Sequence, residues 1–252
     1  MIAIKKVAAS ALCACAGVIF YAPSAWALLP IQHWTEPSGA KVWLVESPVI
    51  PMVDVQVDFD GGSRRDPAAQ AGLAASVALM ASKGVKGGKE WQGAEPALDE
   101  NALGEAWADL GAGFEAGAYN DALRYSLRSL TDAPLLDRAA RLAARQMAEP
   151  SWPADIWARD RARWSASLRE AATRPSTVAG EAFNAAVYGS HPYGQRTTPE
   201  TLARISVDDM QRFHAQTVAA CRARVSIVGA VNRAQAQELV AKLLGRLPAS
   251  GG

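Results

Sequence analysis

The sequence is poor in cysteine, with three in 252 residues. Two of them, Cys13 and Cys15, lie in an N-terminal segment that has the pattern of a signal peptide. Cys221 is then the only cysteine of the mature chain. One cysteine cannot form an internal disulfide, so we expect packing to stabilise the fold.

Histidine is equally scarce, and no two of the three histidines share a metal-ligand spacing with each other or with Cys221. We expect His33 at a strand end, His191 in a turn and His214 on a helix surface. A zinc site needs three or four convergent ligands, which this set does not provide. A Gly-x-Ser-x-Gly elbow is also missing. The segment Gly111-Ala112-Gly113 follows a helix rather than a strand, which excludes a dinucleotide loop. The residues alone therefore predict no catalytic group, no metal and no cofactor.

A charge excess of one sign is absent as well. The formal net charge is +1, and loss of Lys5 and Lys6 with the N-terminal segment would take it to −1. Acidic and basic residues are interspersed along the chain. This pattern argues against a nucleic-acid partner or an anionic membrane surface.

The N-terminus has the three parts of a signal peptide. Lys5 and Lys6 precede an apolar run from Val7 to Tyr21, and Ala25-Trp26-Ala27 provides a cleavage site. A membrane-spanning helix needs roughly 20 apolar residues, so a permanent anchor is the weaker interpretation. Lipid attachment at Cys15 is a second, less favoured alternative. We expect a signal peptide at 1–27, one domain at 28–248 and a linker or tail at 249–252, in a periplasmic or secreted protein.

The hydrophobic pattern of the remaining chain predicts strands, helices, strands and helices in turn. Residues 52–60 alternate strictly between apolar and polar side chains, as in a half-buried strand. Asp66-Pro67 has the form of a helix start, and Val85 to Ala97 has the composition of an exposed loop. The order favours an α+β domain, with an antiparallel sheet packed against several helices in two layers. We expect further strands at 41–46, 113–118, 123–130 and 222–228, and further helices at 98–111, 134–147, 154–172, 178–188, 207–218 and 232–245.

Several short motifs recur in the order and spacing found in one peptidase family. They are Gly61-Gly62-Ser63-Arg64, Ala71-Gly72-Leu73-Ala74, Met80-Ala81-Ser82-Lys83-Gly84, Leu110-Gly111-Ala112, Tyr188-Gly189-Ser190-His191-Pro192-Tyr193-Gly194, Ile227-Val228-Gly229 and Leu247-Pro248. Together they make the chain similar to the first half of a pitrilysin/insulinase-type zinc peptidase. The resemblance covers residues 33–248.

Active members of this family carry His-x-x-Glu-His on the helix after Gly-Leu-Ala. The two histidines bind zinc and the glutamate activates the bound water. The matching residues are Ala75, Ala78 and Leu79, which bind no metal and accept no proton. The third ligand, a later glutamate, aligns with Ser167, with Asp160 seven residues before it. The resemblance therefore implies a non-catalytic member of the family.

The resemblance also implies partners. Bacterial members often work in pairs, in which a subunit without the motif helps to enclose the peptide and its second half can assist catalysis. The expected partner is a zinc-bearing homologous subunit or a missing second half. Peptide binding by strand addition is expected at the edge strand formed by Phe114, Glu115, Ala116, Gly117 and Ala118. Two alternatives stay open: an active metalloendopeptidase with an unrecognised site, and a stand-alone peptide-binding module.

Overall fold

The computed structural model describes residues 30–90 and 93–250. The contacts divide the chain into two units, Met1–Pro30 and Ile31–Gly252. All the elements below belong to the second unit. The expected signal peptide at 1–27 lies outside the described residues. Within the described residues, no helix combines the length and the apolar character that crossing a membrane requires.

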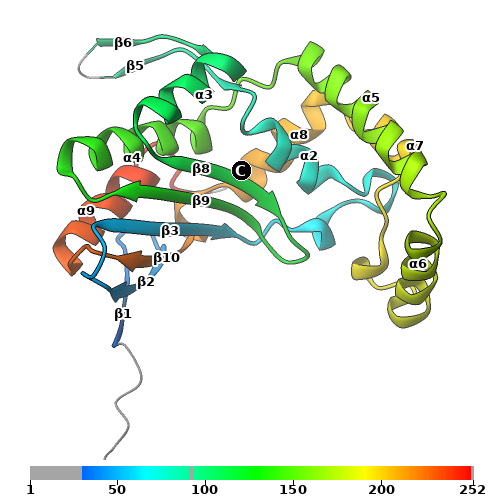
Figure 1. Cartoon of the computed structure of the whole chain (residues 1–252), viewed down its shortest axis with the longest axis horizontal. Coiled ribbons are helices and arrows are strands. Elements are labelled where there is room, and N and C mark those ends of the chain that lie inside the picture. The colour runs from blue at the N-terminus through cyan, green and yellow to red at the C-terminus, as the bar shows by residue number, and fades with distance from the viewer. Residues whose placement is uncertain (1–29, 91–92, 251–252) are drawn as a thin grey trace, which may run out of the picture. The chain divides into compact units, whose positions relative to one another are not determined.

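The second unit is built on a six-stranded sheet with the order β1-β2-β10-β3-β9-β8 (Figure 1). All neighbouring strands are antiparallel except β10 and β2, which run parallel. The strands are β1 (Ile31–Thr35), β2 (Lys41–Glu46), β3 (Met52–Phe59), β8 (Gly113–Ala118), β9 (Leu123–Leu130) and β10 (Arg224–Gly229).

The α+β class is confirmed, but the expected wholly antiparallel sheet is wrong at one pair. A short turn reverses the chain between β2 and β3, yet these two strands do not pair. The late strand β10 lies between them. A strand between two strands of opposite direction must be parallel to one and antiparallel to the other. The sheet is therefore mixed.

Helices follow the strands in chain order. Those of five or more residues are α2 (Leu73–Met80), α3 (Glu100–Asp109), α4 (Ala133–Ala148), α5 (Ala154–Ala171), α6 (Pro175–Tyr188), α7 (Pro199–Ala203), α8 (Val207–Thr217) and α9 (Arg233–Leu244). Three-residue 3₁₀ turns occur at η1 (Ser63–Arg65), η2 (Ala68–Gln70), η3 (Pro192–Gly194) and η4 (Ala220–Arg222). The helix α7 has no counterpart among the sequence predictions.

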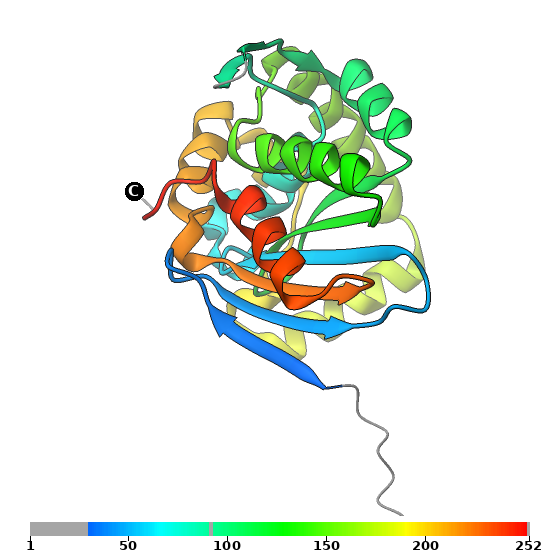
Figure 2. The ribbon, with the colours of Figure 1, turned by 90° about the vertical axis from the view of Figure 1, so that its left-hand side faces the viewer.

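One face of the sheet carries the core. The alternation in β3 buries Val53, Val55, Val57 and Phe59 against the helical layer, whereas Asp54 and its alternate neighbours face outward. Figure 2 shows α4 and α9 side by side against the sheet, in agreement with their direct packing. Large buried side chains from β9, α3 and α8 complete the core; they include Tyr125, Leu103 and Met210.

Trp107, Trp152 and Trp157 are buried. His214 differs from its expected position on a helix surface. Its Nε2 lies 2.8 Å from the carbonyl oxygen of Met147, and its ring meets Trp152 edge to face. Burial lowers the pKa of His214, and the contact with the Met147 carbonyl opposes this shift. The imidazole packs against Trp152.

The structure places the start of α2 later than the sequence predicts. The sequence places it at Asp66-Pro67, but two 3₁₀ turns come first and the helix begins at Leu73. Asp66 still caps the helix from a distance, because its buried carboxylate accepts bonds from the Gly72 and Ala74 amides at 2.8 and 2.9 Å. Gly72 has φ +106°, a backbone conformation that favours glycine. The loop therefore fixes where α2 starts.

The segment Val85 to Ala97, expected as an exposed loop, contains short strands in its described residues. It contains β4 (Gly84–Val85), β5 (Gly88–Glu90) and β6 (Gly93–Glu95); β4 pairs with β7 (Leu98–Asp99), and β5 pairs with β6. Val85 is fully buried. The composition of the segment does not reveal that β4 pairs with residues 98–99. The sequence therefore predicted an exposed loop.

Candidate functional site

The residues singled out by the family motif meet at one cavity of about 710 Å³. Its walls come from α2, β8 and α5, together with residues just outside α2 and at the start of α3. Figure 1 shows these elements at the β8 end of the sheet, away from β1. The lining residues are Ala75, Ala78, Leu79, Lys83, Glu100, Ala116, Gly117, Ala118, Arg159, Asp160, Arg163, Trp164 and Ser167.

The helix α2 forms the apolar wall of this cavity. Its spacing brings Ala75, Ala78 and Leu79 to the same surface, as the i, i+3 and i+4 positions of a helix require. Ala78 is buried, and the other two are half-buried. Methyl and isobutyl groups have no lone pairs, so this wall offers neither metal ligands nor a general base.

The opposite wall is α5, where Ser167 and Asp160 lie two turns apart. Both line the cavity, as the resemblance implies for positions near the third ligand. Ser167 is exposed, and Asp160 is buried. Trp164 lies between them along the helix and contributes a half-buried aromatic surface. Unlike the buried Trp107, Trp152 and Trp157, it borders the cavity.

A compact ionic cluster occupies the polar end of the cavity. The Lys83 ammonium lies 2.5 Å from Glu100 Oε1 and 3.3 Å from Asp160 Oδ2. The Arg159 guanidinium bridges the same two carboxylates, at 3.1 Å from Glu100 and 2.7 Å from Asp160. Arg163 lies further out, 3.8 Å from Asp160. We call Lys83, Glu100, Arg159 and Asp160 the ionic cluster. It joins the segment after α2 to α3 and α5.

The cluster keeps both acids ionised. A hydrogen bond from Arg159, followed by one from Lys83, lowers the pKa of Asp160 despite its burial. For Glu100 the order is reversed, with Lys83 as the main cause of a lowered pKa. The same contacts raise the pKa of Arg159. Each carboxylate is thus already neutralised by protein cations.

These residues do not fit a catalytic zinc ion. The α2 wall has no donor atoms, and Glu100 and Asp160 are engaged with Lys83 and Arg159. A dication at this end would lie beside two fixed positive charges, which opposes its binding. Across the described residues 30–90 and 93–250, no group of three or more histidine, cysteine or acidic side chains is arranged to hold a metal.

The strand β8 runs along the rim of the cavity and is the last strand of the sheet on that side. Ala116, Gly117 and Ala118 line the cavity. The other two residues of the expected peptide-binding strand lie elsewhere. Phe114 stacks on Trp107 at 5.4 Å between ring centroids, and Glu115 lines a separate hollow on the outer sheet face.

Two other family motifs meet at the β8–β9 turn, which the sequence did not predict. The Tyr193 hydroxyl lies 2.7 Å from both carboxylate oxygens of Asp121, and Arg64 Nε lies 2.8 Å from the same group. A Cβ on Gly62 would lie 2.3 Å from the Tyr119 carbonyl oxygen, so a glycine is needed there. The Gly61–Arg64 segment and the segment around Tyr193 are therefore joined through this turn. The sequence marked both segments as family motifs, but it did not indicate that they contact each other through Asp121.

Scans against protein-family models and against curated proteins give no match. Solved structures match strongly. A peptidase M16 inactive domain from Pseudomonas fluorescens is 30% identical with a TM-score of 0.81, over 89% of this chain and 52% of that one. The first half of the periplasmic protease PqqL from Escherichia coli is 16% identical with a TM-score of 0.72, over 87% and 47%. Pitrilysin is 22% identical with a TM-score of 0.68, over 87% and 23%.

The fold and the cavity define a peptidase-like α+β domain. The 30% identity to an M16 domain, joined to the motif register, identifies the family. The chain belongs to the pitrilysin, or M16, peptidase family and corresponds to a first-half domain. It spans about half the length of the Pseudomonas fluorescens protein that it matches.

The ionic cluster makes a prediction about stability. Lys83→Met should lower the free energy of unfolding at pH 7 by about 2 kcal/mol, because it leaves two carboxylates with one cation fewer. The folded state lowers the pKa of Asp160 and Glu100 below their ordinary values of 3.8 and 4.5. Their stabilisation is therefore present above those values and disappears as pH falls through the lower, folded values. Urea unfolding at several pH values measures it.

The matched control is Arg163→Gln, whose side chain is 73% exposed. We expect it to change the unfolding free energy by less than about 0.5 kcal/mol. The difference between Lys83→Met and the parent chain should shrink in acid. Equal effects of the two substitutions at every pH would contradict a stabilising role of the cluster.

Proposed function

We propose that the chain is a catalytically inactive, peptidase-like subunit or half-subunit of a periplasmic zinc-peptidase complex, in which it helps to enclose substrate or to assemble the partner. One observation carries this proposal. The residues that the resemblance aligns with the zinc ligands and the general base meet at one cavity, but they are Ala75, Ala78, Leu79 and Ser167. A cavity without the zinc ligands and the general base of the family suits enclosure better than hydrolysis.

The neighbours support a partner of the same family. The M16 structure of Pseudomonas fluorescens and the structure of a protease from Helicobacter pylori are each about twice as long as the region that this chain matches, at 52% and 51% coverage. In the proposal, a homologous half or subunit supplies the remaining surface and the zinc. The periplasmic location rests on the expected signal peptide and on the location stated for PqqL.

The capture of a specific partner tests this proposal. The tagged chain, purified from its own host under native conditions, should carry a second protein that contains His-x-x-Glu-His and holds one zinc. Mass spectrometry identifies the partner, elemental analysis gives its zinc content and light scattering gives the mass of the complex. A stable monomer without affinity for any zinc-bearing homologue would overturn the proposal. Cleavage of unfolded peptides by the pure chain, abolished by a chelator, would favour the alternative of an active metallopeptidase.

Peptide binding at β8 is a second candidate function, favoured by the position of this edge strand beside the cavity. An extended peptide added to β8 would pair by main-chain hydrogen bonds, and the apolar surfaces of Ala116, Ala118, Leu79 and Trp164 would receive its side chains. Catalysis is not needed for this mode. A stand-alone peptide-binding module would need no partner.

Filling the cavity tests the peptide-binding mode. Ser167→Trp should weaken the binding of an unfolded peptide at least tenfold, because a bulky ring then occupies the α5 wall. Ala166→Trp is the control, since Ala166 is exposed on the same helix and does not line the cavity. Fluorescence anisotropy of a labelled peptide measures the affinity. Equal affinity of both variants, or no measurable binding to the parent chain, would exclude this mode.

A further inference from the structure

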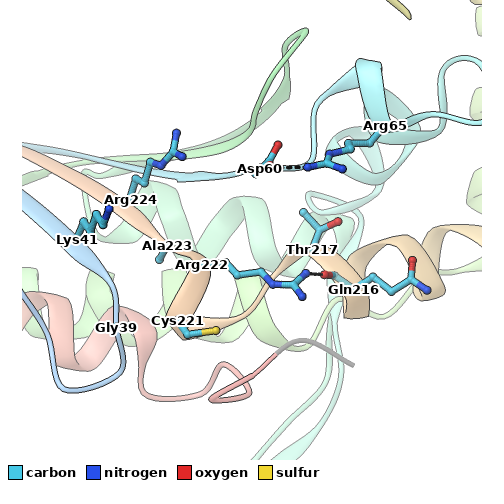
Figure 3. Close-up of a pocket in the computed structure, with 10 residues that line it drawn as sticks. All are labelled: Gly39, Lys41, Asp60, Arg65, Gln216, Thr217, Cys221, Arg222, Ala223 and Arg224. Atoms are coloured by element: carbon cyan, nitrogen blue, oxygen red, sulfur yellow. Dashed lines mark hydrogen bonds and ion pairs between the residues drawn. The ribbon is translucent and has the colours of Figure 1, made fainter.

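A second cavity lies apart from the peptidase-like one and shares no residue with it. It has a volume of about 620 Å³ and opens beside the first residues of β2 and β10, the end of β3 and the end of α8 (Figure 3). This size is typical of small-molecule pockets. The lining residues are Gly39, Lys41, Asp60, Arg65, Gln216, Thr217, Cys221, Arg222, Ala223 and Arg224.

Positive charge is concentrated around this cavity. Lys41, Arg65, Arg222 and Arg224 line it, against one carboxylate, Asp60. The whole chain has a net charge of only +1, so this is a strong local excess. Such clustering in a concave surface raises the local concentration of anions.

Lys41 and Arg224 are the two cations available for a ligand. They are direct neighbours in the parallel β2–β10 register, and both are exposed. Within residues 30–90 and 93–250, neither has a carboxylate within ion-pair distance. Two adjacent cations repel each other unless an anion lies between them. Figure 3 shows both on the strand side of the opening.

The nearby acids are already engaged. Asp58 is the cross-strand neighbour of Arg224, but its carboxylate accepts two bonds from Arg124, at 2.7 and 3.2 Å. Asp60 lies 2.5 Å from the guanidinium groups of both Arg64 and Arg65. Hydrogen bonding from Arg65 is the main cause that lowers the pKa of Asp60, which therefore stays ionised. Neither acid is left to neutralise Lys41.

The remaining wall offers directional polar groups. Arg222 donates to the backbone carbonyl of Gln216, which fixes its guanidinium near the opening. Thr217 adds a hydroxyl from the end of α8. Figure 3 shows Arg65 and Gln216 across the opening from the strand side. Arginine forks and hydroxyls are the groups that recognise planar or tetrahedral oxyanions.

We propose that this cavity, lined by Lys41, Arg65, Arg222 and Arg224, is a binding site for an oxyanion of the phosphate or carboxylate type. The ligand lies between Lys41 and Arg224 and takes bonds from both. The shared chemistry can come from free phosphate or from the terminal carboxylate of a peptide. The site does not depend on the proposed peptidase-related function.

Titration calorimetry at low ionic strength tests the site with three probes: inorganic phosphate, a short peptide with a free terminal carboxylate, and the same peptide as a terminal amide. At least one of the first two should bind with one-site saturation, and added sodium chloride should weaken it. The double variant Lys41→Gln/Arg224→Gln should lose at least tenfold in affinity, because both charge-assisted contacts are removed.

Arg138→Gln is the matched control, since Arg138 is an exposed cation on α4 that does not line the cavity. Its affinity should stay within twofold of the parent chain. The single variants Lys41→Gln and Arg224→Gln should give intermediate affinities, which keeps the test decisive if the double variant unfolds.

The pattern of probes identifies the source of the anion. Preference for the free carboxylate over the amide assigns a peptide terminus, and binding of phosphate alone assigns a phosphate ligand. No saturable binding of phosphate or carboxylate would overturn the proposal. Binding that is unchanged in the Lys41 and Arg224 variants would overturn it equally.

Discussion

Burial of α2 is the constraint on which the rest of the structure depends. This short helix is apolar on nearly every side and packs between the sheet and α8, with six of its eight residues buried. A helix that is apolar all round is stable only inside a core. Its start is fixed by Asp66 through the Gly72 and Ala74 amides, and its position sets the wall of the peptidase-like cavity.

The same helix connects the fold to the missing zinc ligands, because its cavity wall consists of Ala75, Ala78 and Leu79. In a zinc peptidase of this family, ligands from α2 and from the later helix would meet at a metal ion. Here Lys83, just after α2, reaches Glu100 on α3 and Asp160 on α5. Charge pairing thus links the segments around the cavity where the family uses a metal. The desolvated pair of Lys83 and Asp160 is tolerated because Arg159 and Glu100 complete it.

The sequence predicted those parts of the fold that depend on local pattern. The alternation of Met52–Phe59 and the closing helix expected at 232–245 are both present in the structure, the latter as α9 with Asn232 as its cap. The position of β10 between β2 and β3 was not predictable, because its pairing partners lie more than 160 residues earlier in the chain. Hydrophobic periodicity reports only local structure. The start of α2 was misplaced because Asp66 caps over eight residues rather than three.

The candidate site shows the same division between local and long-range information. The motif register brought Ala75, Ala78, Leu79 and Ser167 to attention, and the structure places all four at one cavity. The motif register did not indicate the ionic cluster. Lys83 and Asp160 are far apart in the chain, and in the sequence each resembles an ordinary solvated charge. Glu115 faces the outer side of the sheet because alternate residues of a strand face opposite sides. The prediction of a five-residue edge strand did not distinguish these two faces.

The central claim is that the cavity has the geometry of a peptidase site and lacks only the zinc ligands and the general base at the motif positions. The zinc content of purified chains, measured by elemental analysis after incubation with zinc and gel filtration, tests it directly. The parent chain should hold no stoichiometric zinc. The triple variant Ala75→His/Leu79→His/Ser167→Glu should hold one zinc per chain. A parent chain with one tightly bound zinc, or a folded triple variant with none, would contradict the account.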